Sequence, residues 1–575
     1  MLGVIAPAAP AVDFELGDIS GRLDTTLSWG QNYRVSARDP DLVGIANGGN
    51  AYSVNADDGN LNYDRGLISN AFLVTSELEA HYRNFGLFVR GTGLRDTLND
   101  GGSTERTPLT EAAIDRVGKD LRLLDAYLSV RFDVADRPAE LRIGEQVVNW
   151  GESTFIQNGI NAINPFDVSK LRVPGAELRE ALLPVGVIWG NLSLSPNLSL
   201  EAFYQYDHEE TELEPPGTYF STNDFVGDGG RFVYLGFGGL DDFIGDQPSP
   251  VGAVPRGADD RPEHGGQYGA ALRAYLPDWN YSEVGFYFIN YHSRLPIVNA
   301  RTGTAAGAMA GNYPGSARYF ISYPEDIRLF GASLNTELGN TGIALQGEIS
   351  HRLDQPLQVD DVELLFAALG AQCGISPAAC PLANQNQIGS FGFATDVPGH
   401  IERDVSQLQF TATKVLGPLL KANQGLLLAE VGITHVHDMP DKRDLRLDGP
   451  GTFISGNEAL AAFHAPTAAG ETESWTHFAD ATSWGYRLVG RLEYNNVFAG
   501  INLQPRIAWS HDVSGTTPAP ITNFVEDRKA VTLGLKATYQ QNWEADFSYT
   551  NFFGAGRHNL LNDRDFASFT LRYSF

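Results

Sequence analysis

Strict alternation of apolar and polar residues, running to the last residue of the chain, constrains this sequence more than any other feature. In the segment 565–575, DFASFTLRYSF, apolar side chains occupy every second position and the series closes on Phe575. A two-residue period is typical of a β-strand with one apolar and one mainly polar face. A strand in a soluble sandwich would alternate in the same way. The rest of the chain therefore has to show whether this strand belongs to a soluble sandwich or to another kind of sheet.

The same alternation recurs along the chain, for example at 124–134, 198–207 and 543–550. The connections between these segments alternate in length: short turns follow every second segment, and long loops separate the others. Short turns at one end and long loops at the other are typical of outer-membrane barrels. The pattern predicts an all-β fold, a transmembrane antiparallel β-barrel of roughly 18 strands, with 16 or 14 as alternatives because weak strands are easily miscounted.

Composition excludes several other classes. The formal net charge is −29, which is the opposite of the basic footprint that a nucleic-acid-binding protein needs. No apolar run reaches the 18 or so residues of a membrane-spanning helix, and two cysteines cannot build a disulfide or zinc scaffold. The acidic excess suits an outer surface that faces lipopolysaccharide bridged by divalent cations.

The sequence predicts a short processed leader followed by one domain. Residues 1–11 resemble the end of a signal peptide, with a small-residue cleavage site and no basic residue before Arg22. The remainder, 12–575, is expected to be a single outer-membrane barrel domain. Its candidate constriction loop is 150–183, and its long external loops are 209–265, 293–325, 353–400 and 437–481.

Several stretches resemble one family closely: LDTTLSWGQNYRV (23–35), NADDGNLNYDRG (55–66), the run 142–184 and PPGTYFSTNDF (215–225). They are similar to the proteobacterial outer-membrane family catalogued as domain of unknown function 1302. The resemblance implies a barrel in the outer membrane of a Gram-negative bacterium. It also implies a periplasmic partner of family 1329, an RND-type inner-membrane transporter and a hydrophobic small-molecule cargo, such as a lipid, sterol or hydrocarbon.

In outer-membrane barrels, a final strand with this alternation and a terminal aromatic residue resembles the signal that the barrel assembly machinery reads. That resemblance places the signal of this chain on Phe569, Leu571, Tyr573 and Phe575.

The segment 150–183 is too long for a turn and does not alternate. Turn-rich stretches are followed by PGAELREAL (174–182), which predicts a short helix with Pro174 near its start. We expect this segment to fold into the barrel and constrict it, because a wide lumen needs a selective element; an ordered external loop is the alternative. The candidate constriction residues are Trp150, Glu152, Asn161, Asn164, Asp167 and Arg172.

Acidic residues suggest a cation site in one loop. Oxygen-bearing side chains alternate around Gly59, as Ca²⁺ prefers, although the final Glu of an EF-hand is missing. A structural Ca²⁺ is therefore one interpretation and a solvated loop the other, and no other cofactor is expected. A second acidic stretch, 209–263, holds 12 Asp and Glu residues and could attract cations to the mouth. The candidate ligands in the first loop are Asp57, Asp58, Asn60, Asn62 and Asp64.

Two apolar patches with helical character, 362–369 and 459–463, lie within long loops. Exposed apolar surface of this kind marks interaction sites, so the patches could admit a hydrophobic ligand, or they could pack on each other. Cys373 and Cys380 lie close in one of these loops and are expected to form a disulfide in an oxidising compartment. The patch residues are Leu364, Leu365, Phe366, Leu369, Leu460 and Phe463.

Motifs of common enzymes are missing: the sequence has no G-x-S-x-G, H-E-x-x-H or G-x-x-x-x-G-K-[ST] pattern. We therefore expect no catalytic residues, although a dispersed triad in a barrel-embedded lipid hydrolase would leave no motif. The leading expectation is a channel or transporter for hydrophobic molecules. A diffusion porin for nutrients is the first alternative, and a surface receptor or adhesin is the second.

Overall fold

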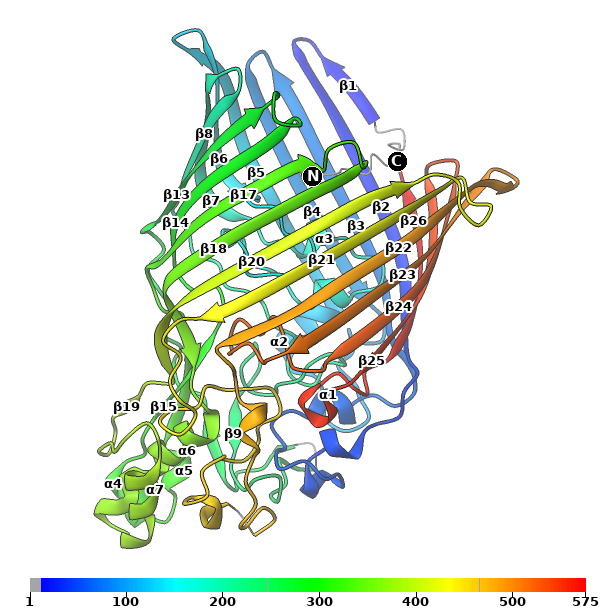
Figure 1. The fold of residues 1–575 in the computed structure, drawn as a ribbon. Coiled ribbons are helices and arrows are strands. Elements are labelled where there is room, and N and C mark those ends of the chain that lie inside the picture. Colours follow the sequence, from blue (N-terminus) through cyan, green and yellow to red (C-terminus); the bar gives the residue numbers. More distant parts are fainter. Residues whose placement is uncertain (1–11, 246, 465) are drawn as a thin grey trace.

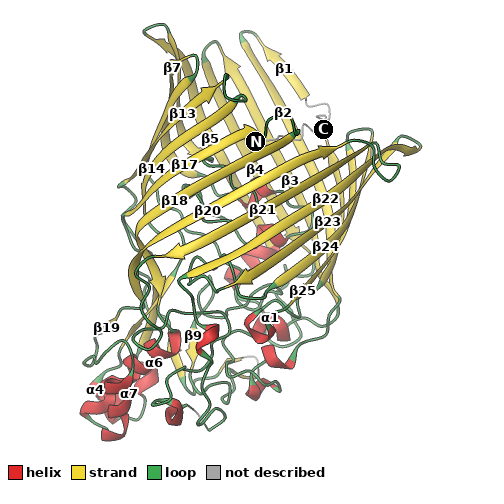
Figure 2. Ribbon diagram, in the orientation of Figure 1, coloured by secondary structure: helices red, strands yellow, loops and turns green. Residues whose placement is uncertain are grey.

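Eighteen antiparallel strands close a barrel in the computed structural model, which describes residues 12–245, 247–464 and 466–575 (Figures 1 and 2). The expected leader at 1–11 lies outside these residues. The barrel strands are β2 (Ile19–Arg34), β3 (Gly66–Tyr82), β4 (Phe85–Asp96), β5 (Lys119–Val134), β6 (Arg137–Gln146), β7 (Val185–Ser195), β8 (Leu198–Gln205), β13 (Gln267–Leu276), β14 (Ser282–Tyr291), β17 (Ile327–Glu337), β18 (Ile343–Gln358), β20 (His400–Leu416), β21 (Gln424–Val436), β22 (Thr482–Phe498), β23 (Ile501–Ser514), β24 (Lys529–Tyr539), β25 (Trp543–Phe553) and β26 (Phe566–Ser574).

The last strand closes the barrel on the first one. β26 pairs with β2 from Thr26 opposite Ser574 to Arg34 opposite Phe566, and β2 also pairs with β3. A short strand, β1 (Val12–Leu16), pairs with the start of β2 and belongs to the same sheet without being part of the closed ring. Closure pairs the backbone groups of every barrel strand with two neighbours, as a structure in lipid requires. The predicted fold class and the count of 18 are therefore confirmed.

The two-residue period places apolar side chains on the outside of the barrel. Leu121 is 89 % exposed and Phe547 is 52 % exposed, whereas Glu348 and Glu430, on the inner face, are almost fully buried. Polar side chains thus line the inside and apolar ones cover the outside, as expected for a barrel in a bilayer.

Short turns lie at one end of the barrel and long loops at the other (Figure 1). Ala135 and Asp136, which form the two-residue turn between β5 and β6, both have positive φ, the geometry that matches the right-handed twist of a hairpin. The chain ends near the short turns, where the backbone N–H of Thr25 donates to the carbonyl of Phe575.

The long loops carry small elements of their own and form a cap at their end of the barrel (Figure 2). Among the described residues, no helix is both long and apolar enough to cross a membrane. The strands of the cap are β9 (Phe232–Tyr234), β10 (Phe243–Ile244), β11 (Gln247–Pro248), β12 (Ala253–Pro255), β15 (Ile297–Arg301), β16 (Arg318–Ser322) and β19 (Asp396–Val397); the helices outside the barrel strands are α1 (Asp58–Leu61), α2 (Glu111–Ala113), α3 (Leu178–Ala181), α4 (Ala305–Met309), α5 (Tyr313–Ser316), α6 (Asp361–Gly370) and α7 (Cys380–Gln385).

Candidate functional site: a segment inside the barrel and a pocket in the cap

The connection 147–184 between β6 and β7 folds into the barrel, where its helix α3 lies (Figure 1). Asn164 holds the base of this inner segment, because its amide accepts from the N–H of Val148 (2.8 Å) and donates to the carbonyl of Leu183 (2.8 Å). The point where the chain leaves the wall is thereby tied to the point where it returns.

Next to the base, the inner segment packs on the adjoining wall. Trp150 is 1 % exposed, lies against Phe203 of β8 and Tyr287 of β14, and donates from Nε1 to the carboxylate of Glu201 (2.8 Å). Ile160 belongs to the same apolar cluster. This cluster continues the apolar packing of the wall into the lumen.

Glu348 of β18 anchors the middle of the inner segment. Its carboxylate accepts the backbone N–H groups of Glu152, Ser153 (3.1 Å) and Ile160 (2.8 Å). The side chain of Gln409 on β20 donates to the same carboxylate (2.8 Å). A buried carboxylate needs several donors to offset its lost hydration, and the turn of the segment supplies them.

Glu430 of β21 repeats this arrangement further around the wall. It accepts the N–H groups of Thr154 (2.9 Å), Phe155 (2.8 Å) and Ile156 (3.0 Å). The backbone N–H groups of 152–156 and of Ile160 thus all donate to two wall carboxylates. Hydrogen bonds to charged groups are about twice as strong as neutral ones, so this contact fixes the position of the segment.

A glycine makes the close approach to Glu348 feasible. A Cβ at Gly159 would overlap the Oε1 atom of Glu348. Arg352, which lies further along β18 than Glu348, donates to the carbonyls of Asn158 and Gly159. The segment is therefore held by acceptors and donors on the same strand.

The second half of the inner segment runs to the opposite side of the lumen. The carbonyl of Arg172 accepts from Asn32 of β2 (2.9 Å), Glu180 accepts from Thr75 of β3 (2.5 Å), and Glu177 pairs with Arg572 of β26 (2.9 Å). Glu177 and Glu180 also form a capping box at the start of α3, the arrangement that satisfies the first N–H groups of a helix. The predicted helix is present but begins at Leu178, not near Pro174.

One part of the wall stays clear of the inner segment. Among the described residues, no hydrogen bond or ion pair joins the segment to β22, β23 or β24. The inner face there is charged: Arg506 forms a two-pronged ion pair with Asp546 (2.6 and 2.8 Å), and Lys536 pairs with Glu544 (2.9 Å). Arg491 lies opposite Arg506 in the register.

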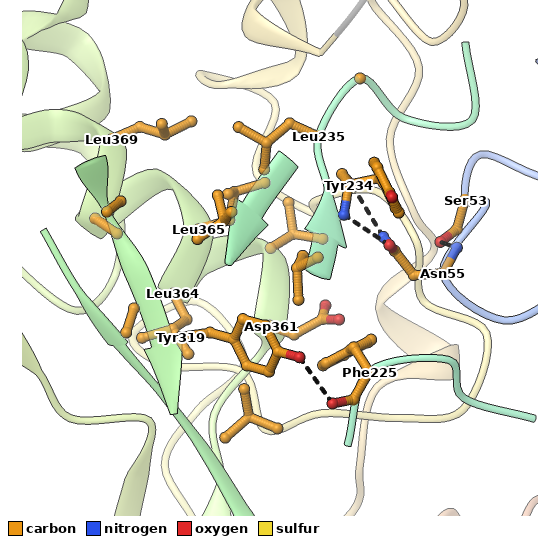
Figure 3. A pocket seen from close by; sticks show the side chains of 18 of the residues that line it. Ser53, Asn55, Phe225, Tyr234, Leu235, Tyr319, Asp361, Leu364, Leu365 and Leu369 are labelled. Carbon is orange, nitrogen blue, oxygen red and sulfur yellow. Dashed lines mark hydrogen bonds between the residues drawn. The ribbon is translucent and has the colours of Figure 1, made fainter. Parts of the chain in front are cut away.

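An apolar pocket lies in the cap, between α6 and the strand pairs β9–β12 and β15–β16 (Figure 3). Its cavity volume is about 110 Å³. Two hydrogen bonds between Asn55 and the backbone of Tyr234 (2.9 and 2.7 Å), and one from the hydroxyl of Tyr319 to the carbonyl of Phe225 (2.9 Å), fix its walls. The apolar lining includes Val233, Leu235, Val254, Leu364, Leu365 and Leu369.

The predicted constriction residues lie on or near the inner segment, in different roles. Trp150, Glu152 and Asn164 make the contacts described above, whereas the side chain of Asn161 donates to that of Asn149 within the segment (2.8 Å). Asp167 is fully buried and accepts from Ser169 (2.5 Å), and the guanidinium of Arg172 stacks over the ring of Phe220. The wall residues that hold the segment, Glu348 and Glu430, were not among the candidates; alternation places them inside but does not reveal their partner.

The five oxygen-bearing side chains of the 57–64 loop do not converge on one point. The prediction that all five form a single cation site is therefore corrected. Asn60 accepts from Arg34, Asn62 accepts from Thr107, and Asp64 pairs with Arg38 (2.8 Å). The segment forms α1, and helical turning points alternate residues in different directions. Of the five, Asp57 and Asp58 are the two that come together in the described part of the chain, with Asp224 from the loop between β8 and β13.

The two apolar patches pack on each other, and the patch 362–369 also lines the pocket. Phe366 and Leu460 are fully buried in one cluster, Phe463 is 37 % exposed, and Leu364, Leu365 and Leu369 line the pocket. Cys373 and Cys380 are joined by a disulfide with a Cα–Cα distance of 4.4 Å.

Leu571 of the expected assembly signal pairs with Trp29, and the rings of Tyr573 and Phe575 are neighbours. Phe569 contacts Trp29 edge-on.

Comparison with known proteins identifies a family and a set of barrels. The family described as "Protein of unknown function (DUF1302)" matches residues 1–575. No curated protein matches the chain. Among solved structures, OccAB1 of Acinetobacter baumannii is similar over 97 % of this chain and 96 % of its own, with 8 % identity and a TM-score of 0.43. OpdK of Pseudomonas aeruginosa, solved with vanillate, is similar over 96 % and 98 %, with 12 % identity and a TM-score of 0.38.

Proposed function

The chain belongs to the family described as protein of unknown function DUF1302, and from this premise we propose that it is an outer-membrane channel whose passage is set by the inner segment 147–184. The single observation that carries the proposal is the attachment of that segment to Glu348 and Glu430 across the lumen. A closed barrel of 18 strands is wide enough for an aqueous channel unless something fills it. The segment narrows the lumen and, among the described residues, makes no hydrogen bond or ion pair with β22–β24.

The location in the outer membrane of a Gram-negative bacterium is part of the same proposal. An apolar outer face is suited to lipid, and the acidic excess of the chain, a net charge of −29, suits an outer surface that faces cation-bridged lipopolysaccharide. The assembly machinery would read the final strand, which ends on Phe575.

The finer proposal is a hydrophobic cargo that binds first in the cap. The pocket of about 110 Å³ has a mainly apolar lining, with Arg301, Arg318 and Asp361 among its polar members. An engineered cavity of about 150 Å³ holds one benzene molecule, so this pocket suits one ring or a short acyl segment of a larger molecule. Delivery to a periplasmic partner of family 1329 and an RND-type transporter belongs to this version.

A second candidate, a channel for small hydrophilic solutes, is favoured by the free part of the lumen. The inner face of β22–β24 carries Arg487, which pairs with Asp512 (2.7 Å), together with Arg491, Arg506 and Lys536. Charged side chains on a wet wall attract and orient charged solutes.

Conductance in planar bilayers tests the role of the inner segment. Replacing 153–180 with a short glycine-serine linker is expected to raise single-channel conductance several-fold, whereas removing the cap hairpin 303–316, which lies outside the barrel, is expected to leave it nearly unchanged. An unchanged conductance after the first deletion would refute the constriction.

Mass spectrometry of molecules that remain bound after gentle extraction separates the two kinds of cargo. An apolar molecule should be retained by the natural chain and lost in Leu365→Asp, because Leu365 lines the pocket. Met309→Asp is the matched control, since Met309 is 72 % exposed and lies on α4. Retention of no apolar molecule, together with permeation of charged solutes into liposomes, would favour the hydrophilic channel.

A further inference from the structure

Four carboxylates meet in the cap, where two external loops cross. Asp57, Asp58 and Asp224 each place an oxygen within 4.8 Å of the others. Asp242 belongs to the same group, because its carboxylate and that of Asp58 are bound by one guanidinium, that of Arg106. Asp57 is fully buried and Asp58 is 8 % exposed, so solvent does little to screen their repulsion.

The positive charge around this group is too small to balance it. Arg106 contacts Asp58 (2.8 Å) and Asp242 (2.5 Å). Two other guanidinium groups lie nearby in the described part of the chain: that of Arg231, which lines a small cavity together with Asp58 and Asp242, and that of Arg564, which is paired with Asp563 (2.7 Å). Four carboxylates against Arg106 leave a local deficit that one divalent cation would nearly cancel. Burial raises the pKa of Asp57 to about 7, with the charge of Asp242 adding to the effect.

Two of the carboxylates have an oxygen without a partner. The Oδ2 atom of Asp57 accepts from the N–H of Gly44 (2.7 Å) and from Asn47 (3.0 Å), but its Oδ1 atom is buried and has no hydrogen bond to any residue that the structure describes. The Oδ1 atom of Asp224 is buried in the same condition, although its Oδ2 atom accepts from the N–H of Asp58 (3.2 Å). A buried oxygen without a donor is costly, and a metal ion would satisfy both.

Space for an ion and its water lies beside Asp58 and Asp224. Asp58, Asp224 and Asp242 line a cavity of about 80 Å³, together with Thr107, Arg231 and Tyr234. A water molecule needs only about 10–15 Å³ on this scale. Ca²⁺ takes six to eight oxygens, some of them from water, so three carboxylates and several waters complete its shell.

We propose that Asp57, Asp58 and Asp224 bind one hydrated divalent cation, Ca²⁺ in preference to Mg²⁺, with Asp242 in the outer shell. The preference follows from the site, which offers several carboxylates in an irregular arrangement that suits the flexible geometry of Ca²⁺ better than the strict octahedron of Mg²⁺.

The cation would fasten two loops that form one wall of the apolar pocket. Asp57 follows Asn55, and Asp224 precedes Phe225; both Asn55 and Phe225 line the pocket. The N–H of Asp224 already donates to the carbonyl of Asn55 (2.9 Å). Bound Ca²⁺ therefore stiffens the wall whether or not a hydrophobic cargo uses it, and the inference stands apart from the proposed function.

Calcium titration of the full chain tests the site. The protein is refolded from inclusion bodies into detergent free of lipopolysaccharide, treated with EDTA, and titrated with CaCl₂ and MgCl₂ by calorimetry. The natural chain should bind one Ca²⁺, and Asp57→Asn/Asp224→Asn should weaken binding by at least about tenfold, because two of the carboxylate ligands lose their charge. If the double variant does not refold, Asp224→Asn alone should show a smaller loss.

The matched control is Asp64→Asn, the same change at an acidic residue of the same loop that pairs with Arg38 at the surface. It should bind Ca²⁺ like the natural chain. Thermal melting gives a second readout: Ca²⁺ should raise the melting temperature of the natural chain and of Asp64→Asn, but not of the double variant. In EDTA, the double variant should melt no lower than the natural chain, because repulsion is relieved. Absence of Ca²⁺ binding, equal binding by the double variant, or an equal loss in Asp64→Asn would each overturn the proposal.

Discussion

Two regions of this chain leave the barrel wall, and they are held in place by different forces. The inner segment 147–184 is fixed in the lumen mainly by backbone N–H groups that bind the buried carboxylates of Glu348 and Glu430. The cap around α6 is fixed by apolar packing, with Phe366 and Leu460 at its centre. The inner segment also buries Trp150 and Ile160 against the wall, but its turn is held by directed polar contacts, whereas the cap, at the mouth, builds a small apolar core of its own.

The difference teaches where each region is vulnerable. Polar anchoring depends on a few directed contacts, so one charge can release the inner segment without disturbing the wall. Apolar packing is spread over many contacts, so the cap should lose stability in proportion to the volume that is removed.

The largest effect is expected from Glu348→Ala/Glu430→Ala. The change leaves six N–H groups without acceptors, and each hydrogen bond to a charged group contributes about 1.5–3 kcal/mol. The inner segment should detach, and single-channel conductance should rise several-fold while the barrel still forms. Glu283→Ala is the matched control, because its ion pair with Arg273 is long (3.7 Å) and no hydrogen bond joins its side chain to the segment among the described residues. Equal conductance in all three proteins would show that the anchors do not hold the passage closed.

Phe366→Ala should give the next largest effect, confined to the cap. Truncation of a buried Phe costs about 3–5 kcal/mol, so hydrogen exchange in 361–385 should become faster while exchange in the barrel strands is unaffected. Phe463→Ala, at a position that is 37 % exposed, should change exchange far less. Faster exchange in the barrel as well would mean that cap and wall unfold together.

Gly159→Ala should weaken the polar anchor without altering any charge. The added Cβ would overlap Glu348, and overpacking typically costs about 1–3 kcal/mol. The amide of Ile160 should exchange faster, and conductance should fluctuate more. Gly417→Ala adds the same atom in a short turn where nothing lies within 4 Å and should have no effect. If both variants behave alike, the close approach is not what positions the segment.

The smallest effect is expected from Arg491→Gln on the free part of the wall. Arg491 faces Arg506, whose charge Asp546 already balances, so removal of one cation should shift the reversal potential slightly toward cation selectivity. Lys421→Gln, in a short turn outside the lumen, should leave it unchanged. A shift of equal size in the control would show that the passage does not run along β22–β24.

Prediction from the sequence succeeded where a local pattern carries the information. The alternation that ends at Phe575 predicted the strand β26, and the alternating lengths of the connections predicted how the others are arranged. Reasoning from a local pattern failed for the loop 57–64. A spacing of two residues brings side chains to one site only where the backbone is extended or turns around a common centre. The chain instead forms α1, and Asn60, Asn62 and Asp64 find partners on separate elements.

The sequence by itself determined the closed barrel and its two faces, since a period of two residues is set by the geometry of a strand and every strand reports it independently. Only the tertiary structure decided which charges meet: Glu348 and Glu430 with the segment 147–184, and Asp57 and Asp58 with Asp224. These partners lie more than 100 residues apart in the chain. No local pattern records such a pairing, because the energy of a buried charge depends on what closes around it and not on its neighbours in sequence.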